Sequence, residues 1–458
     1  MRLRRADLRG RVNGLLRFRF TDRRLTSHAG LELVREYLAG VRLNRRLRSV
    51  LGSGFPRSDF GAVALVRVIL GLLLVGGRRL WQLRYMASDP IVQRFCGLRQ
   101  LPTAMTVGTW LRKFSERHVR ILQELNAEIT AETIREVGLG RLTVDVDGSV
   151  ISTGLLVEGA RRGFNPHHRK VPSYYPITAY EAQSGQLLRV ENRAGNVHDG
   201  KASLPFLENL VEQIQSRLGT RPLLEFRMDG AFFRQDVLDF LDGCGTEWAI
   251  KAPFYPWLNL KTYVAEAPQW KKVAADVSAC ESRVEVKTWD RVLRIVLYRK
   301  RVFHPTKKNF QLDLFDPNDG YWEYSAIATN KKLAPRALWH FLNGRGAHEK
   351  ALGELKSGFA FDAVPTLKYA ANSAWQVLSI LAFNLSRGFQ IAAGAKPRRP
   401  NRKRRCCYSL ESIHTLRFKL LGRAGILTAP AGRNTLELGP HAALEHDFNR
   451  ILEYLRAA

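Results

Sequence analysis

Three carboxylates stand out because of where they fall in the sequence. Asp147 closes a run of alternating apolar residues that begins at Leu142, and Asp229 closes a second apolar run that begins at Pro222. Glu349 lies in a predicted helix. Carboxylates at strand ends lie in the crevice where α/β proteins bind ligands, and hard divalent cations prefer their oxygens. Two such cations about 3.5–4 Å apart can stabilise the attacking and leaving oxygens of a phosphoryl displacement, and these three carboxylates are enough to hold such a pair.

Other residues compete for these roles. Asp145 shares a strand face with Asp147, because side chains alternate along a strand, and it stays open as the first ligand. Glu354 is a weaker alternative to Glu349, since it lies five residues further on and on another helix face. His348 is interpreted as an incidental surface residue. An isolated acid is more often a solvated loop residue than a ligand, so the joint placement of three acids carries the prediction.

Two cations share the helix face predicted for Glu349. Arg345 precedes Glu349 by four residues and Lys356 follows it by seven, so the three side chains project from one face. A guanidinium can bind a phosphate through two hydrogen bonds, and a lysine binds it as a point charge.

The elements that must position these residues begin near Arg141. The pattern predicts strands at 142–147, 150–156, 174–180, 186–190, 222–228 and 247–252, with helices at 202–217 and 232–241. Antiparallel strands followed by strand-helix-strand units predict a mixed α/β sheet covered by helices. Residues 254–325 read as a β-rich insertion, in which Trp257, Trp270 and Trp289 are assigned to the β core in preference to base-stacking wedges. From residue 334 onward the pattern is helical.

The charge of the chain favours nucleic acid as a partner. The 458 residues include 72 Lys or Arg and 42 Asp or Glu, a net charge of +30. Residues 1–120 hold 25 Lys or Arg and 7 Asp or Glu, so 25 − 7 = +18 of this surplus lies in about a quarter of the chain. Such a surplus attracts polyanions, and its uneven distribution predicts a basic module joined to a more neutral one.

A membrane partner is not expected. The longest apolar run, residues 62–77, is shorter than the roughly 20 residues of a membrane span and contains Arg67, so it predicts a buried helix. Residues 1–7 are rich in Arg but lack the apolar core of a secretory signal. We therefore expect a cytoplasmic protein.

Two stretches could contact DNA. Residues 89–95 and 101–114 predict two short helices around a break at Gly97, a pattern typical of a helix-turn-helix, with Arg112 and Lys113 as DNA-binding residues. Two ordinary core helices would look the same. Residues 396–405 contain seven Lys or Arg together with Pro397 and Pro400, and they are either a phosphate-backbone contact or a charged tether.

Together these residues resemble the DDE transposases of bacterial insertion sequences. Arg345, Glu349 and Lys356 match both gaps of the Tyr/Arg/Glu/Lys signature around the third acid, although Leu342 stands where the Tyr should be. The segments around Asp147 and Asp229 resemble the first two acid motifs. The 349 − 229 = 120 positions between the last two acids accommodate a β-rich insertion, as in the insertion-sequence-1380-like group.

The resemblance implies an organisation of the chain and a fold. Residues 1–135 would be a helical basic DNA-binding region, 136–253 the first part of an RNase H-like catalytic domain, and 254–325 the β-rich insertion. Residues 326–395 would complete the catalytic domain, and 396–458 would be a basic linker followed by C-terminal helices.

The resemblance also implies a reaction. Asp147 rather than Asp145 would bridge two Mg²⁺ ions, for which Mn²⁺ can substitute, while Asp229 and Glu349 would each bind one. Arg345 and Lys356 would hold phosphates next to the scissile bond. The substrates would be transposon terminal inverted repeats and target DNA, cut and rejoined by a homodimer that is associated with the nucleoid when bound to DNA. The alternatives are a catalytically inactive or domesticated transposase that only binds DNA, and an RNase H-like structure-selective nuclease.

Overall fold

A computed structural model describes residues 15–21, 23–52, 54–163, 170–197, 199–219, 222–302, 321–401 and 405–457. Residues 1–7 of the predicted cytoplasmic N-terminus lie outside these ranges, as do 303–320 of the β-rich segment and 402–404 of the basic run.

The predicted mixed α/β sheet is confirmed. In the described part of the chain nine strands form one sheet in the order β6-β5-β2-β7-β8-β12-β11-β10-β9. β2 is parallel to β7 and β7 to β8, whereas the other pairs are antiparallel. The strands are β2 (Arg141–Gly148), β5 (Ile177–Glu181), β6 (Gln186–Glu191), β7 (Leu223–Met228), β8 (Glu247–Lys251), β9 (Lys271–Lys272), β10 (Val277–Val286), β11 (Arg291–Val302) and β12 (Tyr321–Thr329).

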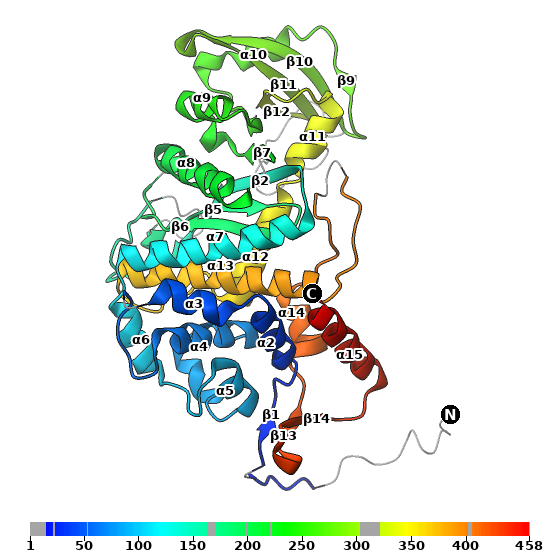
Figure 1. The fold of residues 1–458 in the computed structure, drawn as a ribbon. Coiled ribbons are helices and arrows are strands. Elements are labelled where there is room, and N and C mark those ends of the chain that lie inside the picture. Colours follow the sequence, from blue (N-terminus) through cyan, green and yellow to red (C-terminus); the bar gives the residue numbers. More distant parts are fainter. Residues whose placement is uncertain are drawn as a thin grey trace.

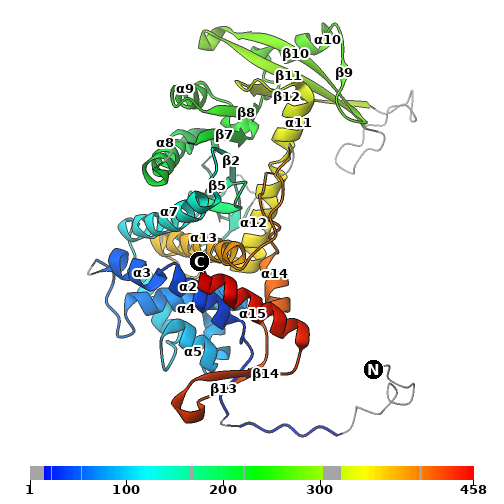
Figure 2. The same cartoon turned by 45° about the vertical axis from the view of Figure 1, so that its right-hand side comes forward.

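Alternation along the strands gives this sheet two different faces. Leu142, Val144 and Val146 of β2 are buried in one apolar cluster with α8 (Asp199–Leu218) and α9 (Gln235–Gly243). The opposite face is covered by α11 (Pro335–Asn343) and α12 (Gly346–Phe359), as Figures 1 and 2 show. Polar residues of β2 point to this second face, because side chains alternate along a strand.

The strands of segment 254–325 continue the main sheet. β12 pairs with β8 through Ile327 and Lys251, and β11 and β10 follow in order. The segment also contains the helix α10 (Leu260–Ala265).

One expectation about the strands is wrong. The extended run predicted for 150–156 shortens to β3 (Ile151–Ser152), which pairs with β4 (Ser173–Tyr174).

The helix α13 (Tyr369–Ala392) is the centre of the helical part of the molecule. It packs against α7 (Glu116–Val137), α4 (Ala62–Val75), α2 (Leu31–Gly40) and β6 (Figure 1). Buried side chains from these helices form one apolar cluster with α12. The basic N-terminal helices therefore share a core with the later part of the chain. Among the described residues, none of the helices combines the length and the apolar character needed to cross a membrane.

The C-terminal region contains a small sheet as well as helices. β13 (Gly425–Thr428) lies between β14 (Thr435–Leu438) and β1 (Leu25–Thr26) near the start of the chain. α15 (Ala442–Ala457) then packs on α2. The expectation of helices alone after the basic linker is incomplete, because the pairing of β1 with β13 joins residues about 400 positions apart in the sequence.

Side-chain amides cover the outer edge of β6. Asn384 of α13 accepts a hydrogen bond from the Leu187 N–H (2.8 Å) and donates one to the Leu187 carbonyl (2.7 Å). Asn126 of α7 donates to the carbonyls of Leu187 and Leu188, at 3.1 Å each. An uncovered strand edge invites pairing with other chains, so these buried amides close the sheet at β6.

Replacing Asn384 by Leu should therefore destabilise the fold. The substitution keeps the volume but leaves a buried N–H without its partner, which costs about 1–3 kcal/mol. Urea unfolding followed by circular dichroism measures the loss. Asn343→Leu is the matched control, since Asn343 is exposed. Equal unfolding midpoints for Asn384→Leu and the unmodified chain would contradict this role.

Candidate functional site

A line of charged and polar residues runs along the second face of the sheet. Thr143, Asp145 and Asp147 follow one another on this face of β2, and Glu225 and Arg227 lie beside them on β7. The register pairs Asp145 with Arg227. The face is thus divided into a network at the strand starts, a buried ion pair in the middle and a solvent-accessible group at the carboxyl ends.

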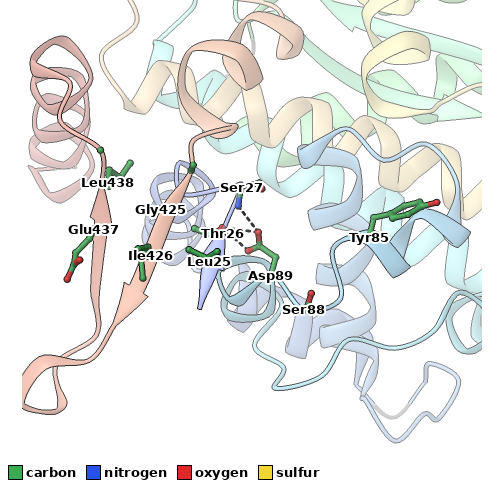
Figure 3. Close-up of a pocket in the computed structure, with 12 residues that line it drawn as sticks. Leu25, Thr26, Ser27, Tyr85, Ser88, Asp89, Gly425, Ile426, Glu437 and Leu438 are labelled. Atoms are coloured by element: carbon green, nitrogen blue, oxygen red, sulfur yellow. Dashed lines mark hydrogen bonds between the residues drawn. The ribbon is translucent and has the colours of Figure 1, made fainter. Parts of the chain in front are cut away.

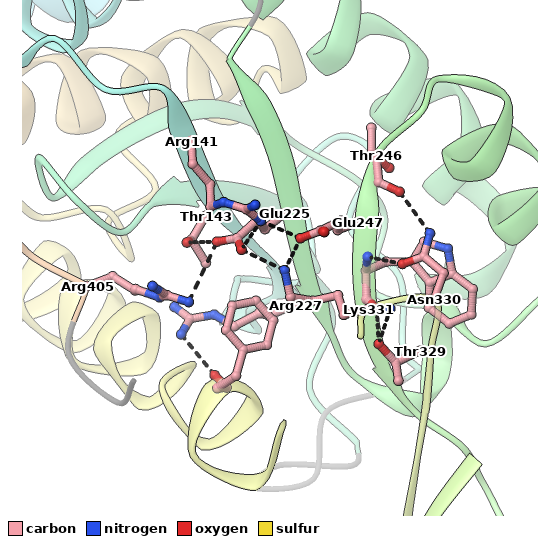
Figure 4. A network of polar contacts seen from close by, with 12 residues as sticks. Arg141, Thr143, Glu225, Arg227, Thr246, Glu247, Thr329, Asn330, Lys331 and Arg405 are labelled. Atoms are coloured by element: carbon pink, nitrogen blue, oxygen red, sulfur yellow. Dashed lines mark hydrogen bonds and ion pairs between the residues drawn. The ribbon is translucent and has the colours of Figure 1, made fainter. Parts of the chain in front are cut away.

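The network at the strand starts is centred on Glu225 (Figure 4). Its carboxylate accepts hydrogen bonds from Lys331 (2.6 Å), Arg141 (2.7 Å) and Thr143 (2.7 Å). Burial alone would raise the pKa of Glu225, but the hydrogen bonds from Lys331 and Thr143 outweigh it and the pKa is lowered. Arg405, the last cation of the basic run, lies 3.8 Å from the same carboxylate. This end of the face is tied together by structural contacts.

Asp145 forms a buried ion pair with Arg227. The Nε and Nη2 atoms of Arg227 lie 2.5 and 2.7 Å from the two carboxylate oxygens, and both side chains are almost completely buried. Nη1 of the same guanidinium donates to the carbonyl of Phe341 in α11 (3.0 Å). Both oxygens of Asp145 are therefore used inside the protein, where they help to hold α11 on the sheet.

Asp147 and Asp229 meet around Arg345. Arg345 immediately precedes α12, and its Nη2 lies 2.9 Å from Asp147 while its Nη1 lies 3.9 Å from Asp229. Lys251, at the end of β8, is 3.8 Å from Asp229. The side chains of Asp147 and Asp229 are 22% and 46% exposed, whereas that of Asp145 is 0% exposed. Two of the three predicted acids are thus brought together, and solvent reaches both.

Glu349 lies one helical turn after Arg345 and is exposed. Its helix, α12, covers the same face of the sheet from which Asp147 projects (Figures 1 and 2). Burial is the main cause that raises the pKa of Asp145, and the negative charge of Glu349 adds to it. Within the described ranges, no three His, Cys, Asp or Glu side chains are gathered closely enough to hold a metal ion. The guanidinium of Arg345 lies between the two aspartates and compensates their charge.

Two residues of α12 have partners of different kinds. Glu354 accepts from Arg387 (2.5 Å) and from the backbone N–H of Ile413 (2.7 Å), so it faces away from the aspartates. Lys356 donates to the carbonyl of Val150 (3.0 Å), and burial lowers its pKa. Lys356 therefore holds the loop that follows β2, and its contact with DNA stays a prediction.

Leu342, at the signature position where a Tyr should stand, is buried. It lies in an apolar cluster with Ala249 and Ile327 and is 5% exposed. This position packs α11 onto the sheet.

The interpretation of His348 as a surface residue is wrong. His348 is 1% exposed, its Nε2 lies 3.0 Å from the hydroxyl of Thr178, and its ring stacks on Tyr180 with the centroids 5.5 Å apart. His348 follows Arg345 by three residues and so turns toward the sheet with it, but the sequence does not show that Thr178 and Tyr180 lie there. Burial, reinforced by the charges of Arg345 and Arg227, lowers the pKa of His348 to about 3.

The buried His348 makes stability depend on pH. Its folded-state pKa lies below the ordinary value near 6.5, so on acidification the unfolded chain takes up a proton that the folded chain does not. Stability should therefore fall as the pH drops below about 6.5, with a loss of about 2 kcal/mol by pH 5. Urea unfolding at pH 7 and pH 5 measures this loss. It should shrink in His348→Gln, and an unchanged pH dependence in that variant would contradict the assignment.

The predicted DNA-binding residues Arg112 and Lys113 lie at the end of α6 (Ala104–Arg112). Both are exposed, and Arg112 donates to the hydroxyl of Thr109 (2.8 Å). α5 (Pro90–Cys96) precedes α6 and ends at Gly97, which adopts a positive φ of 71°. Figure 1 places both helices below α13 and the large sheet above it. The helix-turn-helix stays a prediction.

Exposed aromatic rings follow β8, whose last residue, Lys251, lies 3.8 Å from Asp229. Trp257 is 46% exposed, and its ring stacks on those of Tyr255 and Phe233, with centroids 5.6 and 6.4 Å apart. Trp289 adds a tilted contact at 5.2 Å. The assignment of Trp257 to the β core is wrong, because its side chain is 46% exposed and lies in a short 3₁₀ turn at residues 256–258 rather than in a strand.

Comparisons with known proteins bear on this site. A family model described as "Transposase DDE domain group 1" matches residues 12–458. No curated protein matches the sequence.

Among solved structures, a piggyBac transposase synaptic complex with hairpin DNA is similar at 9% identity and a TM-score of 0.43, covering 88% of this chain and 83% of that one. A Mos1 transposase paired-end complex with left transposon end is 13% identical, with a TM-score of 0.19, and covers 43% of this chain and 59% of that one. These identities and TM-scores are too low to bear on the fold or the function.

Proposed function

The chain belongs to the DDE transposase family, and we propose that it is an active transposase that binds insertion-sequence ends and catalyses metal-dependent cleavage and transfer of DNA strands. The observation that carries this proposal is the convergence of Asp147 and Asp229 on Arg345. The two acids come from the carboxyl ends of adjacent parallel strands, and the cation precedes the helix that carries Glu349.

The sheet supports the RNase H-like fold that the proposal requires. Its first five strands in the chain lie in the order β6-β5-β2-β7-β8, with two antiparallel pairs followed by two parallel ones. β2 and β7, which are the first and fourth of these strands along the chain, are neighbours in the sheet. The acids at their carboxyl ends therefore lie side by side. The location at the carboxyl ends of parallel strands agrees with ligand sites of α/β proteins in general.

The acids around Arg345 have the oxygen chemistry that a hard divalent cation prefers. Asp147 and Asp229 supply partly exposed carboxylate oxygens, and Glu349 lies one helical turn after Arg345 in α12. In this structure the guanidinium of Arg345 lies between the two aspartates. We assign these three as the residues that would hold Mg²⁺ or Mn²⁺, and we exclude Asp145 because Arg227 uses both of its oxygens. When bound, such ions stabilise the attacking and leaving oxygens of a phosphoryl displacement.

The cations around the acids would position DNA. Arg345 and Lys251 flank Asp229. Lys251 is 55% exposed and can contact a phosphate that approaches the carboxylates, whereas Arg345 is 8% exposed and would reach a phosphate only between the two aspartates. The sequence patterns did not single out Lys251, although its place at the end of β8 is analogous to that of Asp229 on β7. The exposed rings of Tyr255 and Trp257, which follow Lys251 along the chain, provide a surface on which an unpaired base could stack.

The proposal is tested with the purified full chain and a DNA fragment that carries the inverted repeats flanking its gene. We expect strand cleavage at the repeat ends with Mg²⁺ or Mn²⁺, and none with EDTA or with scrambled repeats. Binding of the repeats without cleavage under any divalent ion would identify an inactive transposase. Cleavage of branched or hybrid substrates without preference for the repeats would identify a structure-selective nuclease.

A further inference from the structure

A cavity in the N-terminal helical region is lined by cations and by no carboxylate. It has a volume of about 510 Å³ and lies between α3 (Leu43–Leu51), the start of α4 and the end of α5. Arg48 and Arg67 line it, whereas among the described residues no Asp or Glu does. The rest of its lining is neutral. We call it the α4 cavity.

Arg67 is a buried cation without a carboxylate partner. The residue is only 9% exposed, and its Nη1 donates to the neutral Oδ1 of Asn44 (3.0 Å). The guanidinium lies 5.4 Å from the centroid of the Phe95 ring, and its Nε has no hydrogen-bond partner among the described residues. Burial is the main cause that lowers the pKa of Arg67. Because buried charges are normally paired, this guanidinium lacks a counter-ion.

The carboxylate of Glu32 does not fill this role. Its charge acts on Arg67 and raises the pKa of that residue, but it does not line the α4 cavity. Glu32 instead pairs with Arg35 (2.7 Å) and Arg94 (3.0 Å). The positive charge of the α4 cavity is therefore left for a ligand to compensate.

The first turn of α4 faces the same cavity. Ala62, Val63 and Ala64 line it, and no side chain caps this end of the helix. The first backbone N–H groups of a helix have no partner within it, and the helix dipole makes this end positive. Such an end binds anions, and phosphate in particular. Arg67 follows Val63 by four residues, so its guanidinium and these N–H groups converge on one space.

A second cavity shows that this lining is not a general property of a basic chain. It has a volume of about 640 Å³ and lies along β1, β13 and β14. Figure 3 shows two acids, Asp89 and Glu437, among the residues around it. An anion would be repelled there, whereas the α4 cavity attracts one.

We propose that the α4 cavity binds a phosphoryl group, held by Arg48, Arg67 and the first turn of α4. Two guanidinium groups and free backbone N–H groups match the oxygens of such a group. A phosphate of the DNA backbone and a free phosphate compound offer the same chemistry. Figure 1 shows α3, α4 and α5 below α13 and the large sheet with the acids above it. The inference therefore goes beyond the proposed function and requires no cleavage.

The test is thermal unfolding of the full chain without DNA or metal, in 100 mM potassium phosphate and in potassium chloride of equal ionic strength. Phosphate should raise the Tm of the unmodified chain by about 2 °C or more. Arg67→Met and Arg48→Met should lose most of this rise. Arg45→Met is the matched control, because Arg45 is exposed on the same helix and does not line the α4 cavity. It should keep the rise, which includes any general stabilisation by phosphate.

A substitution that imitates the ligand provides a second variant that keeps Arg67. Ala62→Asp places a carboxylate in the first turn of α4, where negative charge is favourable. It should stabilise the chain in chloride and remove most of the rise in phosphate. This variant and Arg48→Met keep the proposal testable if Arg67→Met fails to fold. A rise of the same size in Arg48→Met, Ala62→Asp and Arg45→Met would overturn the proposal.

Gel-shift titration with duplex DNA at fixed salt identifies the source of the phosphoryl group. If it belongs to the DNA backbone, Arg48→Met should bind about 10-fold more weakly than Arg45→Met, since only the first loses a phosphate contact. Equal affinities of the two variants, together with the loss of the phosphate rise in Arg48→Met, would assign the site to a free phosphate compound. Asp147→Asn should keep the phosphate rise, so failure of this proposal is distinguishable from failure of the proposed function.

Discussion

Asp147→Asn should lower DNA strand cleavage by about 10³-fold or more, because an amide cannot replace a carboxylate that holds a divalent cation. Asp229→Asn and Glu349→Gln should have effects of the same size. Affinity for end DNA should change little, since most of it comes from contacts of cations with the phosphate backbone. Cleavage of a labelled end fragment and gel-shift titration of the same fragment measure the two quantities on one preparation.

Two controls make this result specific. Glu266→Gln replaces an exposed acid outside the site and should leave cleavage unchanged. Thermal unfolding of Asp229→Asn and Glu349→Gln should match that of the unmodified chain, because both side chains are accessible to solvent, whereas Asp147→Asn also removes a partner of the buried Arg345 and should unfold at a lower temperature. Cleavage at the normal rate by any one of the three purified variants would remove that residue from the catalytic assignment.

Breaking the Asp145–Arg227 pair should have the largest effect on stability. Arg227→Met leaves a buried carboxylate without its partner, and this costs about 3–5 kcal/mol. Asp145→Leu combined with Arg227→Met removes both charges and should recover much of the loss, because the desolvation penalty disappears with them. The free energy of unfolding in urea for both single variants and the double variant completes the cycle.

The exposed pair Arg234–Asp236 is the matched control for this cycle. Its atoms approach to 2.8 Å, but the two side chains are 42% and 39% exposed, so its removal should cost less than about 1 kcal/mol. A cost for Arg227→Met no larger than that for Arg234→Met would show that the buried pair does not hold α11 and β2 together.

The acids of the site could be found from sequence because their signals are local. Alternation along 142–147 and 222–228 predicts both strands and the position at which each one ends. Helical spacing relates Arg345 to Glu349, and the structure has both at the start of α12. Each pattern extends over fewer than about a dozen residues, so the geometry of a single strand or helix is enough to predict which side chains share a face.

Features that depend on a distant partner could not be predicted in this way. Asp145 and Asp147 share a strand face, and they differ only because Arg227 lies opposite Asp145. His348 is buried because it bonds to Thr178 and stacks on Tyr180, which lie some 170 positions earlier in the chain. The sequence patterns did not show that these segments adjoin.

The sequence by itself determined the strand-and-helix alternation of the middle of this chain, the mixed sheet and the three acids at element ends. The tertiary structure decided which acid is buried in an ion pair and which remains open to solvent, and it placed Arg345 between two aspartates that are 82 positions apart. Local periodicity fixes the direction in which a side chain points. What it meets there is fixed by strand order and helix packing, because these bring together residues from distant parts of the chain.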